Sequence, residues 1–141
     1  MDKTLTGRPI VAGSAEGSAL VSKEPISLWG GLSPRTGEII DRRHELSGAV
    51  ATGRVFVFPR GRGSSTSSAT LLECIKRGVA PAAIINLKVD PILALGSIVS
   101  DELYGRALPI VVLSDEDFFS IKQDDHVTIR PDGKVQISRR S

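Results

Sequence analysis

The residues best suited to chemistry lie in a short polar stretch that follows an apolar segment. Residues 55–58 are β-branched and aromatic, which is typical of a buried strand. The stretch that we call the glycine-rich loop then contains Arg60, Gly61, Arg62, Gly63, Ser64, Ser65 and Thr66. Its glycines allow a ligand close to the backbone, its arginines can bind a carboxylate or phosphate, and its hydroxyl residues can cap a helix whose first N–H groups attract anions. The pattern predicts an anion site where a serine could act on the bound molecule.

The glycine-rich loop lacks the spacing of three well-known motifs. It contains no Gly-Lys-Ser/Thr of a Walker A loop, no third glycine of the dinucleotide fingerprint and no Gly-x-Ser-x-Gly of a nucleophile elbow. Ser64, His44 and Asp41 have the residue types of a catalytic triad, but no pattern in the sequence places them together. A tight strand-to-helix turn, capped by serine and flanked by solvated arginines, remains the alternative to a binding site.

Strand and helix patterns alternate through the middle of the chain. Strands are expected at 7–13, 17–22, 55–58, 82–85 and 109–113, helices at 65–77 and from Pro91 onward, a helical turn at 115–119, and a hairpin at 126–130 and 134–138. Asp90 and Pro91 are of the types preferred at a helix N-cap and at the first helical position. The alternation predicts an α/β fold with parallel central strands and additional β structure at both termini, in one domain covering 1–141.

Hydrophobic spacing predicts which face of each helix is buried. In the helix at 65–77 the expected face comprises Leu71, Leu72 and Ile75, with Ala69 packed closely beside them. In the helix that follows Asp90 the expected face comprises Ile92, Leu95, and Ile98 or Val99.

Composition and charge argue against several classes of protein. A net charge of +2, an aromatic fraction of 4% and scattered basic residues argue against nucleic-acid binding. The single cysteine, Cys74, cannot form an internal disulfide or a Cys-rich metal site, and we expect it in the core. The sequence after Met1 lacks a charged-then-apolar leader, and no apolar run approaches the roughly 20 residues that cross a bilayer. We therefore expect a soluble cytoplasmic protein without membrane contact.

Three further side chains are interpreted from their local context. His126 begins a C-terminal strand and is expected at the surface. Trp29, beside two glycines, could lie in the core or in a subunit interface. If Trp29 and Leu32 were both exposed, they would form an apolar patch of the kind that interfaces use.

Four blocks of the sequence resemble the small subunit, or swivelling domain, of the aconitase-X family of dehydratases. They are Ser33-Pro34 with residues 37–41, His44 and Gly48; residues 55–68; residues 78–85; and residues 109–112. The resemblance covers nearly the whole chain, and the Gly-Arg-Gly-Ser-Ser run at 61–65 is its most specific part. It implies the aconitase-like swivelling β/β/α domain, which agrees with the predicted α/β fold.

The same resemblance implies a hydro-lyase made of two parts. A large catalytic subunit carries an iron–sulfur cluster on its own cysteines, and the swivelling domain closes over the active site. This chain would bind no cofactor or metal and would form a heterodimer with that large subunit. Ser64 would be the general base that takes a proton from the substrate carbon while the cluster iron draws off the hydroxyl. The other residues of the glycine-rich loop would bind a small anionic substrate.

Two questions stay open in the sequence. Ser33, Asp41 and His44 could line the cleft, or Asp41 and His44 could hydrogen-bond to hold the loop 33–37, and we favour the structural role for Asp41 and His44. The expected substrate is cis-3-hydroxy-L-proline, with mevalonate 5-phosphate as the alternative. The alternative of another class is a stand-alone anion-binding module or a phosphoryl carrier, although a carrier needs a histidine in the loop where this chain has serine.

Overall fold

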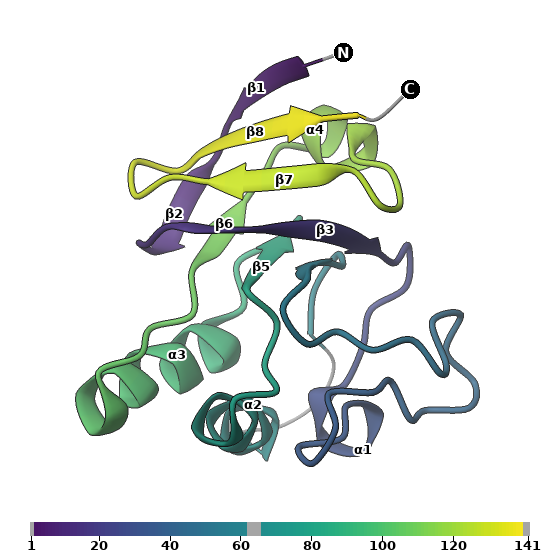
Figure 1. Ribbon diagram of the computed structural model, residues 1–141, viewed down its shortest axis with the longest axis vertical. Helices are drawn as coiled ribbons and strands as arrows, with labels where there is room; N and C mark the ends of the chain where they lie inside the picture. The colour runs from purple at the N-terminus through teal and green to yellow at the C-terminus, as the bar shows by residue number, and fades with distance from the viewer. Residues whose placement is uncertain (1, 62–65, 140–141) are drawn as a thin grey trace.

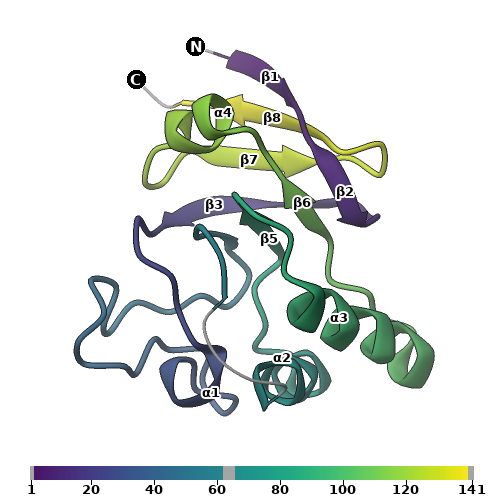
Figure 2. The same ribbon diagram turned by 180° about the vertical axis from the view of Figure 1, so that it is seen from behind.

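The computed structural model describes residues 2–61 and 66–139. Within these ranges the strands are β1 (Asp2–Thr6), β2 (Arg8–Val11), β3 (Ala15–Val21), β4 (Val55–Val57), β5 (Ala83–Asn86), β6 (Ile110–Val112), β7 (His126–Ile129) and β8 (Lys134–Ser138). The helices are α1 (Leu28–Gly31), α2 (Thr66–Arg77), α3 (Pro91–Tyr104) and α4 (Asp115–Ser120). Helices α1, α2 and α3 lie together at one end of the molecule, and α4 lies at the other end beside β8 (Figures 1 and 2).

The strands form one mixed sheet in the order β1-β8-β7-β3-β4-β5-β6-β2. Strands β3, β4, β5 and β6 are parallel, whereas β1, β8, β7 and β2 pair in antiparallel fashion with their neighbours. Because β1 and β2 follow one another across Gly7, the same stretch of chain borders both ends of the sheet. The Gly7 N–H donates to the Gly133 carbonyl at 3.0 Å, and a Cβ at Gly7 would collide with Val111. A glycine is therefore needed where the chain changes partner strands.

Both faces of the parallel strands are buried, which explains why their sequences are continuously apolar rather than alternating. Along β4, Val55 and Val57 contact an apolar cluster that includes Phe118 of α4 and the inner residues of the β7–β8 hairpin. Phe56 and Phe58 point to the opposite side, into a cluster that α2 and α3 cover. The predicted fold class, a mixed α/β domain with parallel central strands and extra β structure at both termini, is confirmed.

Two packing predictions are wrong. Ala69 is exposed rather than packed. Apart from Leu93, helix α3 buries small residues, while Leu95 and Ile98 of the expected buried face are 54% and 50% exposed. The buried residues of α3 are Leu93, Ala94, Gly96, Ser97 and Ser100. The reason is the close approach of α2 and α3, since a Cβ at Gly96 would lie 3.0 Å from the Ser68 carbonyl oxygen, where no large side chain fits.

The exposure of individual side chains tests several predictions about where they lie. Cys74 lies in the core, and burial raises the pKa of its thiol to about 11. His126 lies at the surface, with its Nε2 atom 3.1 Å from Glu16. Trp29 is 64% exposed but Leu32 is buried, so the two do not form a shared apolar patch. In the part of the chain that the structure describes, every helix is too short or too polar to cross a membrane.

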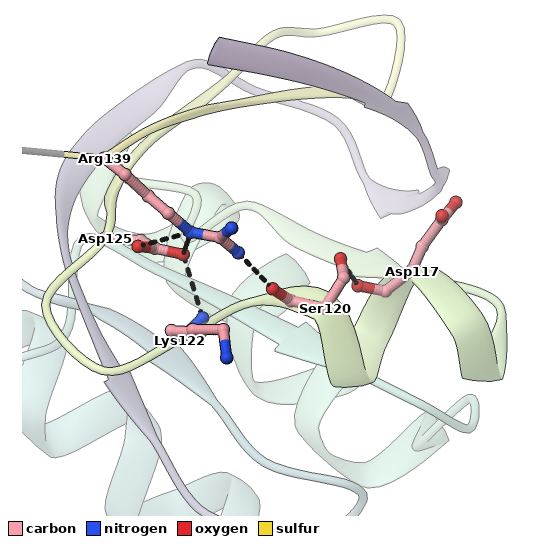
Figure 3. A network of polar contacts seen from close by, with 5 residues as sticks. All are labelled: Asp117, Ser120, Lys122, Asp125 and Arg139. Atoms are coloured by element: carbon pink, nitrogen blue, oxygen red, sulfur yellow. Dashed lines mark hydrogen bonds and ion pairs between the residues drawn. The ribbon is translucent and has the colours of Figure 1, made fainter. Parts of the chain in front are cut away.

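The C-terminal end of the described chain is held by a compact polar network around Asp125 (Figure 3). The Asp125 carboxylate is only 5% exposed; it accepts the Lys122 N–H at 2.8 Å and pairs with the Arg139 guanidinium at 3.2 Å. Arg139 also donates to the Ser120 carbonyl at the end of α4. The network therefore joins α4, the turn before β7 and the residue after β8.

Candidate functional site

The glycine-rich loop starts at the carboxyl edge of the parallel strands. Strands β3, β4, β5 and β6 run in the same direction, so their carboxyl ends lie side by side. Ser22 follows β3, Phe58 follows β4 and Asn86 ends β5 at this edge. In open parallel sheets ligands bind outside this edge, where connecting loops supply the contacts. The fold thus places the candidate loop where α/β proteins bind ligands.

The start of the loop is fastened by hydrogen bonds from the connection between β5 and α3. The Phe58 carbonyl accepts from the side-chain amide of Asn86 at 2.8 Å. The Pro59 carbonyl accepts from the N–H groups of Leu87 and Lys88 at 2.9 and 3.2 Å. These bonds satisfy backbone groups that would otherwise be left unpaired where the strand has ended.

Asp90 makes the next contact with the loop. Its Oδ2 atom accepts the Gly61 N–H at 3.0 Å, while its Oδ1 atom accepts the N–H groups of Ile92 and Leu93 in the first turn of α3. A Cβ at Gly61 would collide with Asp90 Oδ2, so the close approach requires glycine at this position. On the other side, Gly61 forms a parallel bridge with Ile26.

The sequence-predicted loop residues fall into two groups. Arg60 is exposed, Gly61 is half-buried against Asp90, and Thr66 is the exposed first residue of α2. Arg62, Gly63, Ser64 and Ser65 lie outside the described residues. The structure therefore shows the two flanks of the loop, and the role assigned to Ser64 stays a prediction.

Asp41 and His44 lie in a surface depression of about 220 Å³. It is lined by Glu24, Pro25, Ile26, Ser27, Asp41, Arg43 and His44. Because Ile26 also pairs with Gly61, the depression adjoins the start of the glycine-rich loop. Ser33 does not line it.

His44 is buried and fully engaged by hydrogen bonds. Its Nδ1 atom accepts the Leu46 N–H at 3.1 Å, so Nε2 carries the proton and faces Ser22 Oγ at 3.3 Å. The Ser22 hydroxyl contacts Glu45 at 2.9 Å, and Glu45 also accepts the Lys23 N–H at 2.6 Å. The bond from the Lys23 backbone is the main cause that lowers the pKa of Glu45. His44 and Glu45 thereby tie the segment 41–47 to the end of β3.

Ser33 and Asp41 both stabilise local turns. The Ser33 hydroxyl accepts the N–H groups of Arg35 and Thr36 at 3.2 and 3.3 Å. The Asp41 carboxylate accepts the Arg43 N–H at 3.0 Å. Among the described residues, neither Asp41 nor His44 makes a side-chain hydrogen bond to the loop 33–37, and the roles of both residues stay predictions.

Metal ligands do not gather in the part of the chain that the structure describes. Across residues 2–61 and 66–139, no three His, Cys, Asp or Glu side chains lie close enough together to hold a metal ion. The Cys74 thiol is buried among apolar side chains, and this burial raises its pKa.

Sequence reasoning missed the contacts that position this edge. Asp90 was identified only as a helix cap, and Ser22 and Asn86 were not singled out. Ser22 directly follows β3, and Asn86 is the last residue of β5. Asp90 lies in the connection between β5 and α3. Polar residues at the carboxyl ends of neighbouring parallel strands are the signal that could have identified them.

Comparison with known proteins places the chain among related sequences and structures. The family described as the aconitase X swivel domain matches residues 4–137. A cis-3-hydroxy-L-proline dehydratase of Pseudomonas aeruginosa is 53% identical over 108 residues, which are 77% of this chain but only 19% of that protein. A phosphomevalonate dehydratase small subunit of Methanothrix thermoacetophila is 42% identical over 130 residues, covering 91% of this chain and 95% of that protein. The crystal structure of Thermococcus kodakaraensis aconitase X in its holo-form superposes with a TM-score of 0.86 at 36% identity, covering 97% of this chain and 99% of that one.

Proposed function

This chain belongs to the aconitase X swivel-domain family as a dehydratase small subunit, and on that premise we propose that it supplies the general base, Ser64, to a two-subunit hydro-lyase. Residues 1–141 would act as one swivelling unit that closes over the active site of a large subunit. The observation that carries the proposal is the position of the glycine-rich loop. It starts at the carboxyl edge of the parallel strands and leads into the first turn of α2.

A serine needs strong electrostatic support to act as a base, because a free hydroxyl gives up its proton only at very high pH. The positive end of a helix dipole and nearby guanidinium groups both stabilise an alkoxide. The loop has Arg60 at its start and the twelve-residue helix α2 after it. Closure against a partner would exclude water and strengthen both effects. These groups would hold Ser64 ready to take a proton from the carbon next to the substrate carboxylate.

The iron–sulfur cluster expected for this family does not fit the residues of this chain. The chain has one cysteine, and its side chain lies in the core. We therefore propose that the cluster and its ligands belong to the large subunit, and that the isolated small subunit has no dehydratase activity. The contribution of this chain is the base, the contacts with the anionic substrate and the exclusion of water.

We propose cis-3-hydroxy-L-proline as the substrate. This choice is supported by the 53% identity with the Pseudomonas aeruginosa dehydratase, which exceeds the 42% identity with the Methanothrix thermoacetophila small subunit. Mevalonate 5-phosphate remains the second candidate, since the relatives that match this chain along most of their own length act on phosphomevalonate by name. Both molecules carry a carboxylate that an arginine of the loop can bind.

The test is dehydration of both substrates by the complex of this chain with its large subunit, using wild-type protein and two serine variants. Ser64→Ala should lower kcat by at least about 100-fold, because a general base contributes roughly 10²–10⁴-fold. Ser67→Ala is the matched control from the same segment, since its buried hydroxyl has no hydrogen-bond partner among residues 2–61 and 66–139 and its loss should change neither rate nor stability appreciably.

The outcomes separate the competing functions. A Ser64→Ala complex that keeps more than about a tenth of wild-type activity would exclude Ser64 as the base. Turnover of mevalonate 5-phosphate but not hydroxyproline would reverse the substrate assignment. Tight binding of either acid by the isolated chain, measured by calorimetry, together with an inactive complex, would favour a stand-alone anion-binding module.

A further inference from the structure

The carboxylate of Asp90 serves two elements at once. One oxygen, Oδ1, accepts the Ile92 and Leu93 N–H groups at 3.1 and 3.3 Å and so caps α3. The other oxygen, Oδ2, accepts the Gly61 N–H at 3.0 Å and so contacts the glycine-rich loop. A helix cap needs only the first of these contacts, because a serine or threonine with a single side-chain oxygen caps a helix equally well. The second oxygen is therefore available for another role.

We propose that Asp90 is a positioning residue for the reaction: it fixes the backbone of Gly61 and thereby the path of the loop toward Ser64. This inference rests on the proposed function, in which Ser64 is the base. Gly61 precedes Ser64 by three residues, so the anchored amide lies within about 11 Å of the serine along the chain. A small shift at the anchor is carried to the reacting group, and a misplacement of about 1 Å can cost on the order of 100-fold in rate.

Other contacts hold the backbone on either side of the Gly61 amide that Asp90 anchors. Upstream, the Phe58 and Pro59 carbonyls are held by the residues 86–88 that precede Asp90. On the far side, the Ile26 N–H contacts the Arg60 carbonyl at 3.4 Å. Gly61 is thus held from two sides, by the Asp90 carboxylate and by the bridge with Ile26, and it is the last described residue before residue 62. Among the described residues Asp90 forms no ion pair, and its side-chain hydrogen bonds there are all with backbone N–H groups.

Two substitutions separate the anchor from the cap. Asp90→Ser keeps one oxygen for the first turn of α3 and loses the oxygen that reaches Gly61. Asp90→Asn keeps the size of the side chain but retains only one acceptor oxygen, so it cannot serve both partners. Ser114→Ala is the control for the loss of a cap alone, because Ser114 caps α4 through the Asp117 N–H and lies on a different element from the loop.

The experiment measures amide hydrogen exchange and steady-state kinetics on the same variants. Exchange is followed by NMR on the isolated chain, and kinetics are followed on the complex with the large subunit. In Asp90→Ser the Gly61 amide should exchange at least about 10-fold faster while the Ile92 and Leu93 amides keep their protection. The complex should lose about 10- to 100-fold in kcat with KM changed by less than about twofold, since a displaced base weakens the transition state and not substrate binding.

The control decides whether the effect is more than structural. Ser114→Ala should leave kcat and the exchange of Gly61 unchanged. The proposal is overturned if Asp90→Ser frees the Gly61 amide without lowering kcat, or if its loss of rate is matched by Ser114→Ala. It is equally overturned if the Gly61 amide stays protected in both Asp90 variants. A wild-type complex that dehydrates neither substrate would refute the proposed function instead, and the exchange of Gly61 would still decide whether Asp90 holds the loop.

Discussion

Two aspartates in different parts of the molecule accept backbone N–H groups, but their other partners differ. Asp125, at the C-terminal end, pairs with the Arg139 guanidinium as well as the Lys122 N–H (Figure 3). Asp90, at the carboxyl edge of the parallel strands, is half-buried and contacts the N–H groups of Gly61, Ile92 and Leu93. The first carboxylate is neutralised by a cation, and the second is stabilised by backbone dipoles that belong to a loop and a helix.

This difference shows that an aspartate can mainly stabilise the fold or mainly position a loop. The Arg139–Asp125 pair joins segments that are distant in the sequence and have no role in the proposed reaction. The Asp90 contacts join the loop that precedes Ser64 to the start of α3. Removing the Arg139–Asp125 pair should lower the free energy of unfolding and leave kcat nearly unchanged. Removing the Asp90 contacts should lower kcat and leave most of the free energy of unfolding intact. Two substitutions test this comparison and a third tests the contact of Glu45 with the end of β3, in order of decreasing effect.

Asp125→Ala should give the largest loss of stability. It leaves the Arg139 guanidinium without its counter-ion and the Lys122 N–H without its acceptor. Breaking a buried pair costs about 3–5 kcal/mol, and because a third of Arg139 is exposed to solvent we expect about 3 kcal/mol, measured by urea unfolding. Asp101→Ala, which removes an exposed carboxylate from α3, should change stability by less than about 0.5 kcal/mol.

The rate of the Asp125→Ala complex completes this test. Below its unfolding temperature the reconstituted complex should keep kcat within about twofold of wild type, because the Asp125 network joins α4, which lies at the other end of the molecule from α2 and α3 (Figure 1). A folded Asp125→Ala complex with a 10-fold lower kcat would show that the two ends are coupled, and the comparison would be wrong.

Gly61→Ala should give an intermediate loss that depends on Asp90. The added Cβ collides with Asp90 Oδ2, and forcing an extra carbon into a packed position costs about 1–3 kcal/mol. In the Asp90→Ser background the obstructing oxygen is absent, so the same substitution should cost less than half as much. Urea unfolding of the two single variants and the double variant measures this coupling.

Gly48→Ala is the matched control for the glycine substitution. Gly48 has a φ of 91°, and nothing lies within 4 Å of a Cβ placed there, so its cost comes from the backbone alone. That cost should be the same with Asp90 or Ser at position 90. If Asp90→Ser changed the cost of Gly48→Ala as much as it changed the cost of Gly61→Ala, a direct contact between Gly61 and Asp90 would be contradicted.

The central fold could be predicted because its strands and helices carry strong local patterns. Apolar runs such as 55–58 and 82–85 predict buried parallel strands, and the Asp90-Pro91 pair marks the start of α3. Strand β1 was missed because its buried residue, Leu5, stands alone among polar residues and its pairing with β8 is distant in sequence. Long-range pairing of this kind has no local signal.

Part of the candidate site could likewise be predicted because its residues are adjacent in the sequence. Glycines, arginines and hydroxyl residues at 60–66 are contiguous, so the loop could be identified from its composition. The bond between Gly61 and Asp90 joins residues 29 positions apart, and only the parallel pairing of β4 with β5 brings them together. The buried face of α3 was mispredicted because size, and not hydrophobicity, decides which residues fit against α2.

Glu45→Gln should give the smallest effect, and its pH dependence has a definite sign. Glu45 accepts the Lys23 N–H and the Ser22 hydroxyl, and these bonds lower the pKa of its carboxyl, with the Lys23 backbone as the main cause. A carboxyl whose pKa is lower in the folded chain stabilises fully above its ordinary value of about 4.3, and the stabilisation is lost as pH falls through the lower folded value. Because Glu45 is largely exposed, solvent screening limits the contribution to about 0.5 kcal/mol at pH 7.

The measurement is the difference in unfolding free energy between wild type and Glu45→Gln at pH 7 and pH 3. The difference should be present at pH 7 and should shrink at pH 3, where the wild-type carboxyl is itself becoming protonated. Glu102→Gln, at an exposed position of α3, should show no comparable change between the two pH values. A Glu45→Gln difference that grew on acidification would reverse the sign of the linkage. It would also show that the segment 41–47 is tied to β3 by His44 and Ser22 rather than by the charge of Glu45.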